Sequence, residues 1–246
     1  MEIGLITVGD ELLAGDTVNS NATWLADRLT DRGATVERVL ALPDDRATIA
    51  DHVRAYSDEF DAVIVTGGIG GTPDDVTMEA VADAFDREMV VRDTPLDDVE
   101  ETISRYREEH PELDLDIDIE AEASIPAGSR PLLNSAGLAP GCVLENTYVM
   151  PGIPDELKAM FESVEEEFNG DSVSRFLYTV EPEGNIVGEL DEAGTAFDVS
   201  VGCYPDREAG HNRLKITATD ADELDDAAAW LRRHIDASET PVSRDW

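Results

Sequence analysis

Lysine is almost absent from this sequence, and its scarcity limits the partners the protein can have. Only Lys158 and Lys215 occur among 246 residues, and 56 acidic residues against 18 basic ones give a formal net charge of -38. Such a surface repels the phosphates of nucleic acids and anionic membranes, so we expect neither as a partner. Because the acidic residues are spread along the chain, we interpret them as an adaptation to high salt, where ions screen self-repulsion.

Cysteine, histidine and long apolar runs are also scarce. Cys142 and Cys203 lie in strand-like contexts, which predicts buried, reduced thiols in a cytoplasmic protein. The four histidines lack the spacing of zinc ligands. No apolar run approaches the roughly 18 residues of a membrane span. The N-terminus has no basic stretch before its apolar residues, so we expect no secretory signal.

Apolar strands alternate with amphipathic helical patterns over the first 106 residues. The predicted strands span 3–9, 35–42, 62–68 and 88–91, and the predicted helical faces span 22–29, 49–56, 78–85 and 94–106, the last with Tyr106 turned inward. Alternation at this spacing predicts an α/β fold: a doubly wound, mostly parallel sheet with helices on both faces.

The rest of the chain predicts a second, smaller domain. Alternation at 113–120 favours a strand, and a hairpin near Asn146 and a helix over 157–168 complete a first domain at 1–168. Residues 172–246 read as strand, helix, two strands and helix, a small α+β domain that resembles a KH fold. It lacks the GXXG loop with which KH domains clamp phosphates, so we do not expect RNA binding.

The segment TGGIGGTPDDVT (66–77) predicts an anion site without a lysine. It follows a buried strand and precedes a helix, where free backbone N–H groups and the helix dipole favour negative charge. Glycines let the backbone approach a ligand closely. The segment matches neither GxxxxGK[ST] nor GxGxxG, which excludes both common phosphate-binding loops.

Two interpretations of the aspartates in this segment remain open. Thr72 and Asp75 can form a capping box at the start of the helix. Alternatively, Asp74 and Asp75 hold Mg²⁺ or another divalent cation, which is commonly bound by one or two carboxylates together with substrate phosphates. In the second case the cation supplies the positive charge that a lysine would otherwise provide.

Acidic side chains follow the first two strands at the same end of the predicted sheet. GDELLAGDTVNSN (9–21) supplies Asp10 and Glu11, and LPDD (42–45) supplies Asp44. Because the carboxyl ends of parallel strands share one edge, we expect these acids near the glycine loop. Asn19 and Asn21 are candidate ligand-binding residues, and a helix cap is the structural alternative for Asn19.

Together with NSAGLAPG (134–141) and MPGIPDEL (150–157), these motifs resemble the N-terminal region of CinA (competence/damage-inducible) proteins, which has the MoaB/Mog-type molybdopterin-binding fold. The resemblance covers residues 1 to about 168, and the KH-like unit also matches the CinA arrangement. We expect a haloarchaeal, stand-alone form without the CinA deamidase domain. Gly71 and Ser135 stand where the family usually has proline, and 113–120 does not look like the family's helical segment.

The resemblance implies two chemistries for one site. CinA-type domains are associated with cleavage of ADP-ribose and similar pyrophosphates, and related domains with FAD hydrolysis. MoaB/Mog domains bind molybdopterin, and some adenylylate it during molybdenum cofactor biosynthesis. We favour a magnesium-dependent nucleotide pyrophosphatase that works as a homo-oligomer on a small nucleotide or pterin phosphate. Molybdopterin binding or adenylyl transfer is the alternative, and a non-catalytic nucleotide-binding scaffold is the third hypothesis.

Under the favoured hypothesis each motif has a role. Asp75 and Asp74 would hold the metal, and Asp75, Asp44 and Glu11 would be the catalytic acids. Phosphate and ligand would bind to Gly67, Gly68, Gly70, Thr72, Asn19, Asn21, Asn134, Gly137 and Gly141. Gly152 and Pro154 would shape the far side.

Overall fold

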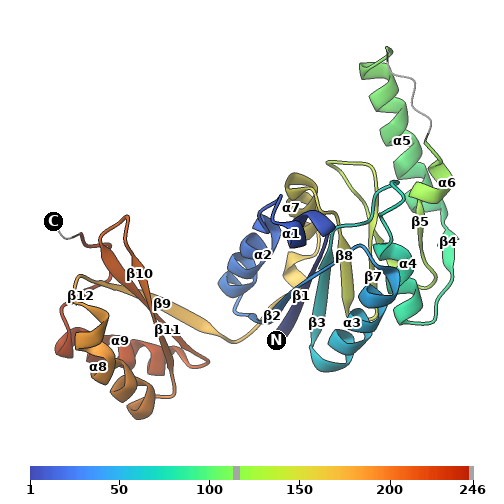
Figure 1. Cartoon of the computed structure of the whole chain (residues 1–246). Helices are drawn as coiled ribbons and strands as arrows, with labels where there is room; N and C mark the ends of the chain where they lie inside the picture. The colour runs from blue at the N-terminus through green and yellow to red at the C-terminus, as the bar shows by residue number, and fades with distance from the viewer. Residues whose placement is uncertain (113–116, 244–246) are drawn as a thin grey trace. The chain divides into compact units, whose positions relative to one another are not determined.

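The chain forms two compact units, Met1–Asn169 and Gly170–Trp246, in a computed structural model (Figure 1) that describes residues 1–112 and 117–243. Each unit has its own sheet and its own apolar core. No helix within these described ranges is long and apolar enough to cross a membrane.

A six-stranded sheet with the order β2-β1-β3-β8-β7-β6 is the centre of the first unit. The parallel strands are β1 (Glu2–Val8), β2 (Thr35–Leu42), β3 (Ala62–Thr66) and β8 (Thr147–Met150). β7 (Gly141–Leu144) runs antiparallel to β8, as the predicted hairpin requires, and β6 (Arg130–Leu132) runs antiparallel to β7. The prediction of a mostly parallel sheet is therefore confirmed.

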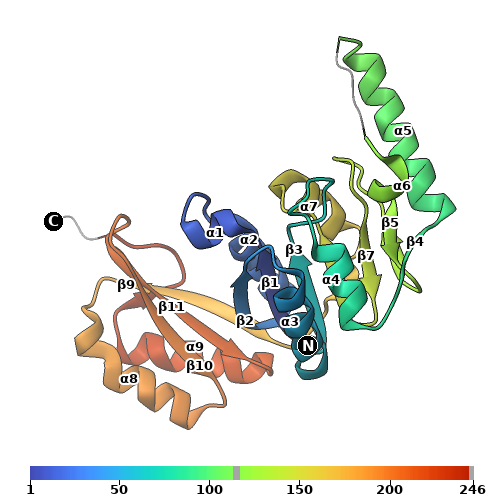
Figure 2. The same ribbon diagram turned by 45° about the vertical axis from the view of Figure 1, so that its right-hand side comes forward.

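Helices cover both faces of this sheet, as Figures 1 and 2 show. They are α2 (Ser20–Asp31) and α7 (Pro154–Glu162) on one face, and α3 (Arg46–Glu59) and α4 (Thr77–Ala84) on the other. Alternate residues of β1 point to opposite faces: Ile3 and Leu5 join the core of α2 and α7, while Ile6 and Val8 join that of α3 and α4. Burial on both faces explains why the strand is continuously apolar.

The predicted helix at 157–168 is shorter than expected. α7 ends at Glu162, and a 3₁₀ turn, η1 (Glu165–Glu167), follows. This turn still brings Val164 and Phe168 into the core, where both are almost fully buried. The apolar spacing therefore identified the buried residues correctly, although the helix is interrupted.

Around α5 (Asp93–Glu109), three predictions are wrong. Tyr106 is 41% exposed, because the outer turns of α5 project from the body of the unit (Figure 2). β4 (Met89–Val91) does not join the parallel sheet and instead pairs antiparallel with β5 (Ser124–Pro126). The predicted strand at 113–120 lies partly outside the described residues. Its last part is wrong, because Asp118 accepts from the Ala121 N–H (3.1 Å) and caps the short helix α6 (Ile119–Glu122).

The second unit has an antiparallel sheet in the order β10-β11-β9-β12. Its elements in chain order are β9 (Val173–Thr179), α8 (Glu183–Ala196), β10 (Ser200–Asp206), β11 (His211–Ala218), α9 (Ala221–His234) and β12 (Ala237–Ser238). The two helices contribute to one apolar core with the sheet. Cys203 in β10 is only partly buried, contrary to prediction, whereas Cys142 in β7 is buried, and this burial raises the pKa of its thiol to about 12.

Candidate functional site

The carboxyl ends of the parallel strands meet at one edge of the sheet. In the strand register Val8 lies beside Leu42, and Thr66 lies beside both Thr7 and Met150. The segments that leave these strands line a hollow of about 460 Å³. Its lining residues are Val8, Gly9, Glu11, Asp44, Gly67, Gly68, Ile69, Gly70, Asp74, Asp75, Ala139, Pro151, Gly152, Ile153, Pro154 and Glu156. We call this the acidic hollow.

Five carboxylates and no basic side chain line the acidic hollow: Glu11, Asp44, Asp74, Asp75 and Glu156. Asp44 accepts a hydrogen bond from the Asp10 N–H (2.8 Å), which ties the end of β2 to the start of α1 (Asp10–Ala14). Burial is the main cause that raises the pKa of Asp44, and the negative charges of Asp10, Glu11 and Asp74 raise it further. The site thus concentrates negative charge that the chain does not neutralise there.

The glycine loop has left-handed backbone at two positions. Gly67 (φ 97°) and Gly68 (φ 65°) adopt conformations that disfavour other residues. The Cα of Gly67 also faces the carbonyl oxygen of Val8, where a side chain has no room, and its N–H donates to the Met150 carbonyl (3.1 Å). The Thr77 hydroxyl lies next to Gly68. It is buried and has no hydrogen-bond partner among the described residues.

A turn at Thr72–Asp75 shows where the capping-box interpretation fails. The Thr72 N–H donates to Asp75 Oδ2 (3.0 Å), and its hydroxyl lies 2.6 Å from carboxylate oxygens of both Asp74 and Asp75. One bond of a capping box is therefore present, but the other is not, because the Asp75 N–H donates to the backbone carbonyl of Thr72 (2.9 Å) and not to its hydroxyl. In addition, α4 begins only at Thr77, after Val76, so the motif closes a turn and caps no helix. Thr72 lines a second hollow, of about 180 Å³, which shares Gly68, Gly70 and Asp75 with the acidic hollow.

The donor set fits a metal ion that is shared with a phosphate ligand. Among the residues that the structure describes, no three His, Cys, Asp or Glu side chains are grouped to hold an ion by themselves. Magnesium commonly takes one or two protein carboxylates and completes its shell with water and phosphate oxygens. Asp74 and Asp75 are adjacent in the chain and line the hollow, and Thr72 occupies only one oxygen of each carboxylate, which leaves the other oxygen of each for a cation.

Asn19 and Asn21 brace the site and do not line the acidic hollow. Asn19 accepts from the Ala22 N–H (3.2 Å) as the N-cap of α2 and donates to the Thr7 hydroxyl (2.9 Å). Asn21 donates to the Gly152 carbonyl oxygen (2.7 Å). Both line a neighbouring hollow of about 90 Å³. Asn19 is therefore a helix cap, which was the structural alternative to ligand binding.

The second glycine segment places a carboxylate that the sequence did not reveal. Asn134 is 1% exposed, and its side-chain N–H groups donate to the Ala139 carbonyl (3.0 Å) and to Glu156 Oε2 (2.8 Å). Gly137 lies against the Glu156 carboxylate, so its missing side chain makes room for it. The MPGIPDEL motif includes Glu156, but only the fold shows that this residue faces Asn134.

Gly141, like Asn134 and Gly137, does not line the acidic hollow. It is buried at the start of β7, where its Cα faces the Val149 carbonyl and the Met160 sulfur. Glycine at position 141 lets β7 pack closely against β8 and α7. Gly141 therefore has a structural role, whereas Gly67, Gly68 and Gly70 line the predicted site.

Comparison with known proteins decides the family. Residues 4–169 match the family described as probable molybdopterin binding domain, which is more than half of the chain. The chain belongs to this family. Residues 171–242 match a second family, described as the middle domain of FAD synthase.

Relatives support the predicted resemblance to CinA. A protein of Archaeoglobus fulgidus is 35% identical over 226 residues, 91% of this chain and 93% of its own. A CinA-like protein of Citrifermentans bemidjiense is 36% identical over 252 residues, which cover 96% of this chain and 59% of that protein. The crystal structure of the protein CinA from Thermoplasma acidophilum has a TM-score of 0.59 at 30% identity, covering 68% of this chain and 97% of that one. The CinA-like, MoaB/Mog-type fold is therefore confirmed.

Proposed function

We propose that this protein is a metal-dependent hydrolase of nucleotide pyrophosphates of the ADP-ribose or FAD class. The observation that carries the proposal is the acidic hollow, which joins a left-handed glycine loop to several carboxylates and has no basic side chain in its lining. Such a site can accept a pyrophosphate only together with a cation. The volume of the acidic hollow, about 460 Å³, also suits a small-molecule ligand.

The residues that line the acidic hollow have different proposed roles, according to their positions. Gly67, Gly68 and Gly70 bring backbone close to the phosphates without side chains in the way. Asp75, with Asp74, would hold a divalent cation, which when bound neutralises phosphate charge and polarises the phosphorus centre. Asp44 and Glu11 lie across the same hollow, where either carboxylate can orient the attacking water.

The reaction balances without another reactant. The water oxygen forms a bond to one phosphorus of the pyrophosphate, and the bond from that phosphorus to the bridging oxygen breaks. The bridging oxygen leaves on the second phosphate, and the two protons of water are released to the carboxylate and to solvent. ADP-ribose would thus give AMP and ribose 5-phosphate.

Molybdopterin binding or adenylyl transfer is the second candidate, because residues 4–169 match a probable molybdopterin binding domain. Both functions use a phosphate-bearing ligand in the same hollow. They differ in whether a pyrophosphate is cleaved by water. Product analysis therefore separates them better than binding does.

The deciding experiment measures turnover in concentrated KCl with magnesium. ADP-ribose, FAD and NAD are offered separately, and AMP is followed by chromatography. We expect AMP release that requires the metal and falls at least 100-fold in Asp75→Asn, a roughly 3 kcal/mol loss. Asp27→Asn, an exposed aspartate of α2, is the matched control and should retain wild-type activity. A folded protein that releases no AMP from any substrate would refute the hydrolase and favour the molybdopterin candidate.

A further inference from the structure

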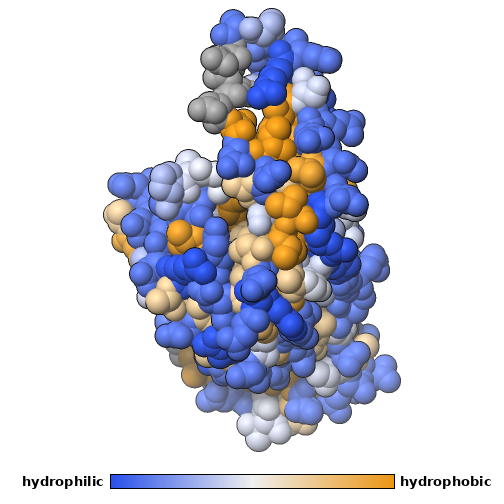
Figure 3. All heavy atoms as spheres, turned by 90° about the vertical axis from the view of Figure 1, so that its right-hand side faces the viewer, coloured by the Kyte–Doolittle hydropathy of each residue, from blue (hydrophilic) through white to orange (hydrophobic). Residues whose placement is uncertain are grey.

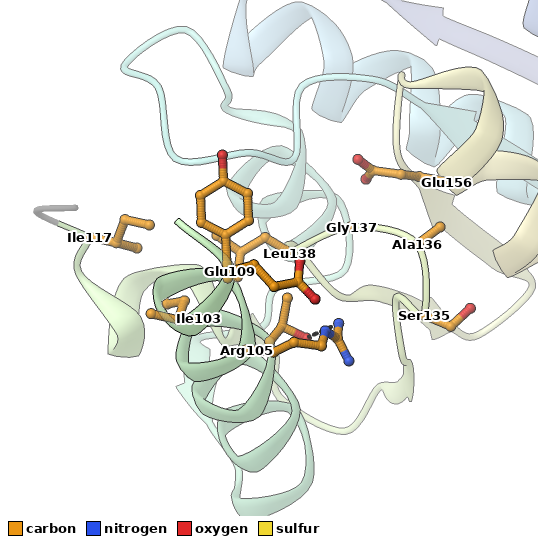
Figure 4. Close-up of a pocket in the computed structure, with 11 residues that line it drawn as sticks. Ile103, Arg105, Glu109, Ile117, Ser135, Ala136, Gly137, Leu138 and Glu156 are labelled. Carbon is orange, nitrogen blue, oxygen red and sulfur yellow. Dashed lines mark hydrogen bonds between the residues drawn. The ribbon is translucent and has the colours of Figure 1, made fainter. Parts of the chain in front are cut away.

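A second hollow, of about 510 Å³, lies between α5 and the turn at 134–138 (Figure 4). Its lining residues are Thr102, Ile103, Arg105, Tyr106, Glu109, Ile117, Ser135, Ala136, Gly137, Leu138 and Glu156. We call this the α5 hollow. Figure 3 shows that hydrophobic residues gather on this side of the first unit, in a strip bordered by hydrophilic ones. Its volume falls within the range of small-molecule sites.

The α5 hollow combines an apolar wall with a partly exposed aromatic ring. Ile103 is 2% exposed and packs with Leu138, which forms the wall. Tyr106 is one helical turn further along α5, on the same face, yet 41% of it is exposed. Its ring contacts the His110 ring at a centroid distance of 4.5 Å. An exposed aromatic beside a buried apolar wall is suited to stack a planar ligand.

The two hollows meet at one carboxylate. Glu156 lines both, and in Figure 4 it lies beside Gly137 at the edge of the α5 hollow. Asn134 holds Glu156 Oε2, and no other hydrogen bond to this carboxylate occurs in the described part of the chain. Its Oε1 can therefore accept from a hydroxyl or a ring N–H of a ligand that spans the border.

The α5 hollow also carries the positive charge that the acidic hollow lacks. Arg105 is the one basic residue among those that line the two hollows. Its guanidinium makes a long contact of 3.5 Å with the Thr102 hydroxyl. Its charge also acts on Asp98, where it partly offsets the rise in the pKa that burial causes. A guanidinium next to an aromatic ring is a common surface for stacking a heteroaromatic ring.

We propose that the α5 hollow binds the planar heteroaromatic ring, a nucleobase or a pterin, of the compound whose phosphates occupy the acidic hollow. Tyr106 and Arg105 stack on the ring, Ile103 and Leu138 contact its edge, and Glu156 accepts a hydrogen bond from the ligand. The inference rests on the proposed function for the position of the phosphates. It adds the part of the site that selects the ligand.

Binding measurements test the ring subsite independently of hydrolysis. Calorimetry in concentrated KCl with magnesium compares AMP with ribose 5-phosphate, which lacks the ring. We expect AMP to bind at least about tenfold more tightly than ribose 5-phosphate. Tyr106→Ala should weaken AMP binding about tenfold, as loss of one base–aromatic stack does, and leave ribose 5-phosphate within about twofold. Adenosine and 6-hydroxymethylpterin, offered as competitors, distinguish a nucleobase from a pterin.

Two further variants control for structural effects. Tyr106→Phe keeps the ring and should retain wild-type affinity, while Tyr204→Ala removes an exposed tyrosine of the second unit and should change nothing. Equal affinity for AMP and ribose 5-phosphate would overturn the ring subsite and leave the phosphate site intact. If neither compound binds, both proposals are wrong. If AMP binding requires Tyr106 but no pyrophosphate is cleaved, the ring subsite stands and the hydrolase fails.

Discussion

The two glycine-rich segments, 66–77 and 134–141, use glycine for different reasons. In the first, Gly67 and Gly68 have positive φ, so the backbone itself takes a conformation that other residues avoid. In the second, Gly137 and Gly141 have ordinary backbone, and glycine is needed only because neighbouring atoms are close. Similar glycine-rich patterns thus reflect an unusual backbone conformation in the first segment and close packing in the second.

Both segments share one device, in which a glycine makes room for a carboxylate. Gly70 lies against Asp75, and Gly137 lies against Glu156. Gly71, where the CinA family usually has proline, lies against Glu122 of α6. Burial, followed by the negative charges of Asp75 and Asp118, raises the pKa of Glu122. Glycine in these motifs therefore lets acidic side chains lie close to the backbone.

Replacing Gly67 should have the largest effect. Gly67→Ala combines a positive φ with a clash against the Val8 carbonyl, so we expect the free energy of unfolding to fall by about 2–4 kcal/mol. Gly128→Ala is the matched control: its φ is also positive, at 87°, but no atom lies within 4 Å of an added Cβ, so strain alone should cost about 1 kcal/mol. Denaturant unfolding measures both. Equal losses would show that close approach at Gly67 is unimportant.

Asn134→Ala should have the next largest effect. It removes the donor to the buried Ala139 carbonyl and to Glu156, so we expect a loss of about 1–3 kcal/mol in unfolding free energy. Asn185→Ala, an exposed position in α8, should change stability by less than about 0.5 kcal/mol. If the two variants were equally stable, the second segment would not depend on Asn134.

Gly137→Ala should separate stability from ligand binding. The added methyl meets the Glu156 carboxylate, the end of a flexible side chain, so we expect less than about 1 kcal/mol of destabilisation. Displaced Glu156 should nevertheless weaken AMP binding. Calorimetry and denaturant unfolding of the same sample measure the two effects. A variant with wild-type affinity would show that the position of Glu156 is irrelevant to the ligand.

Replacing Asp44 should have the smallest effect on the free energy of unfolding, and this effect should depend on pH. Its pKa in the folded protein is raised, mainly by burial, above its ordinary value of 3.8. Its contribution therefore favours folding at acidic pH and is lost as pH rises through the folded pKa. Without divalent cations, Asp44→Asn should be more stable than wild type at pH 7 by less than about 1 kcal/mol, because the carboxylate is partly solvated. The difference should shrink as pH falls towards 4, and a difference that grew instead would contradict this assignment.

Much of the fold and the edge of the site could be predicted because they depend on periodicity. Val8, Leu42 and Thr66 end three parallel strands, and this alone brings Glu11, Asp44 and the glycine loop together. Parallel order follows from alternation of strands with helices. Each strand and helix is visible in its own stretch of sequence, and the parallel order then places the carboxyl ends of the strands at one edge.

The failed predictions concern contacts that periodicity does not encode. Tyr106 continues the apolar stripe of α5, but nothing in the sequence shows that the body of the unit ends near Ile103. Glu156 lies 22 residues from Asn134, and their hydrogen bond exists only after α7 has packed. The capping-box pattern misled because the bond from the Thr72 N–H to the Asp75 carboxylate also forms in a turn outside a helix.

The dependence of nucleotide affinity on a divalent cation is the most direct test of the central claim, that the acidic hollow needs a borrowed positive charge. Calorimetry would compare ADP-ribose binding in concentrated KCl with magnesium and with EDTA, for the wild type and Asp75→Asn. We predict at least about tenfold tighter binding with magnesium, an effect that disappears in Asp75→Asn. Equal affinity in EDTA, with the wild-type protein folded, would contradict it.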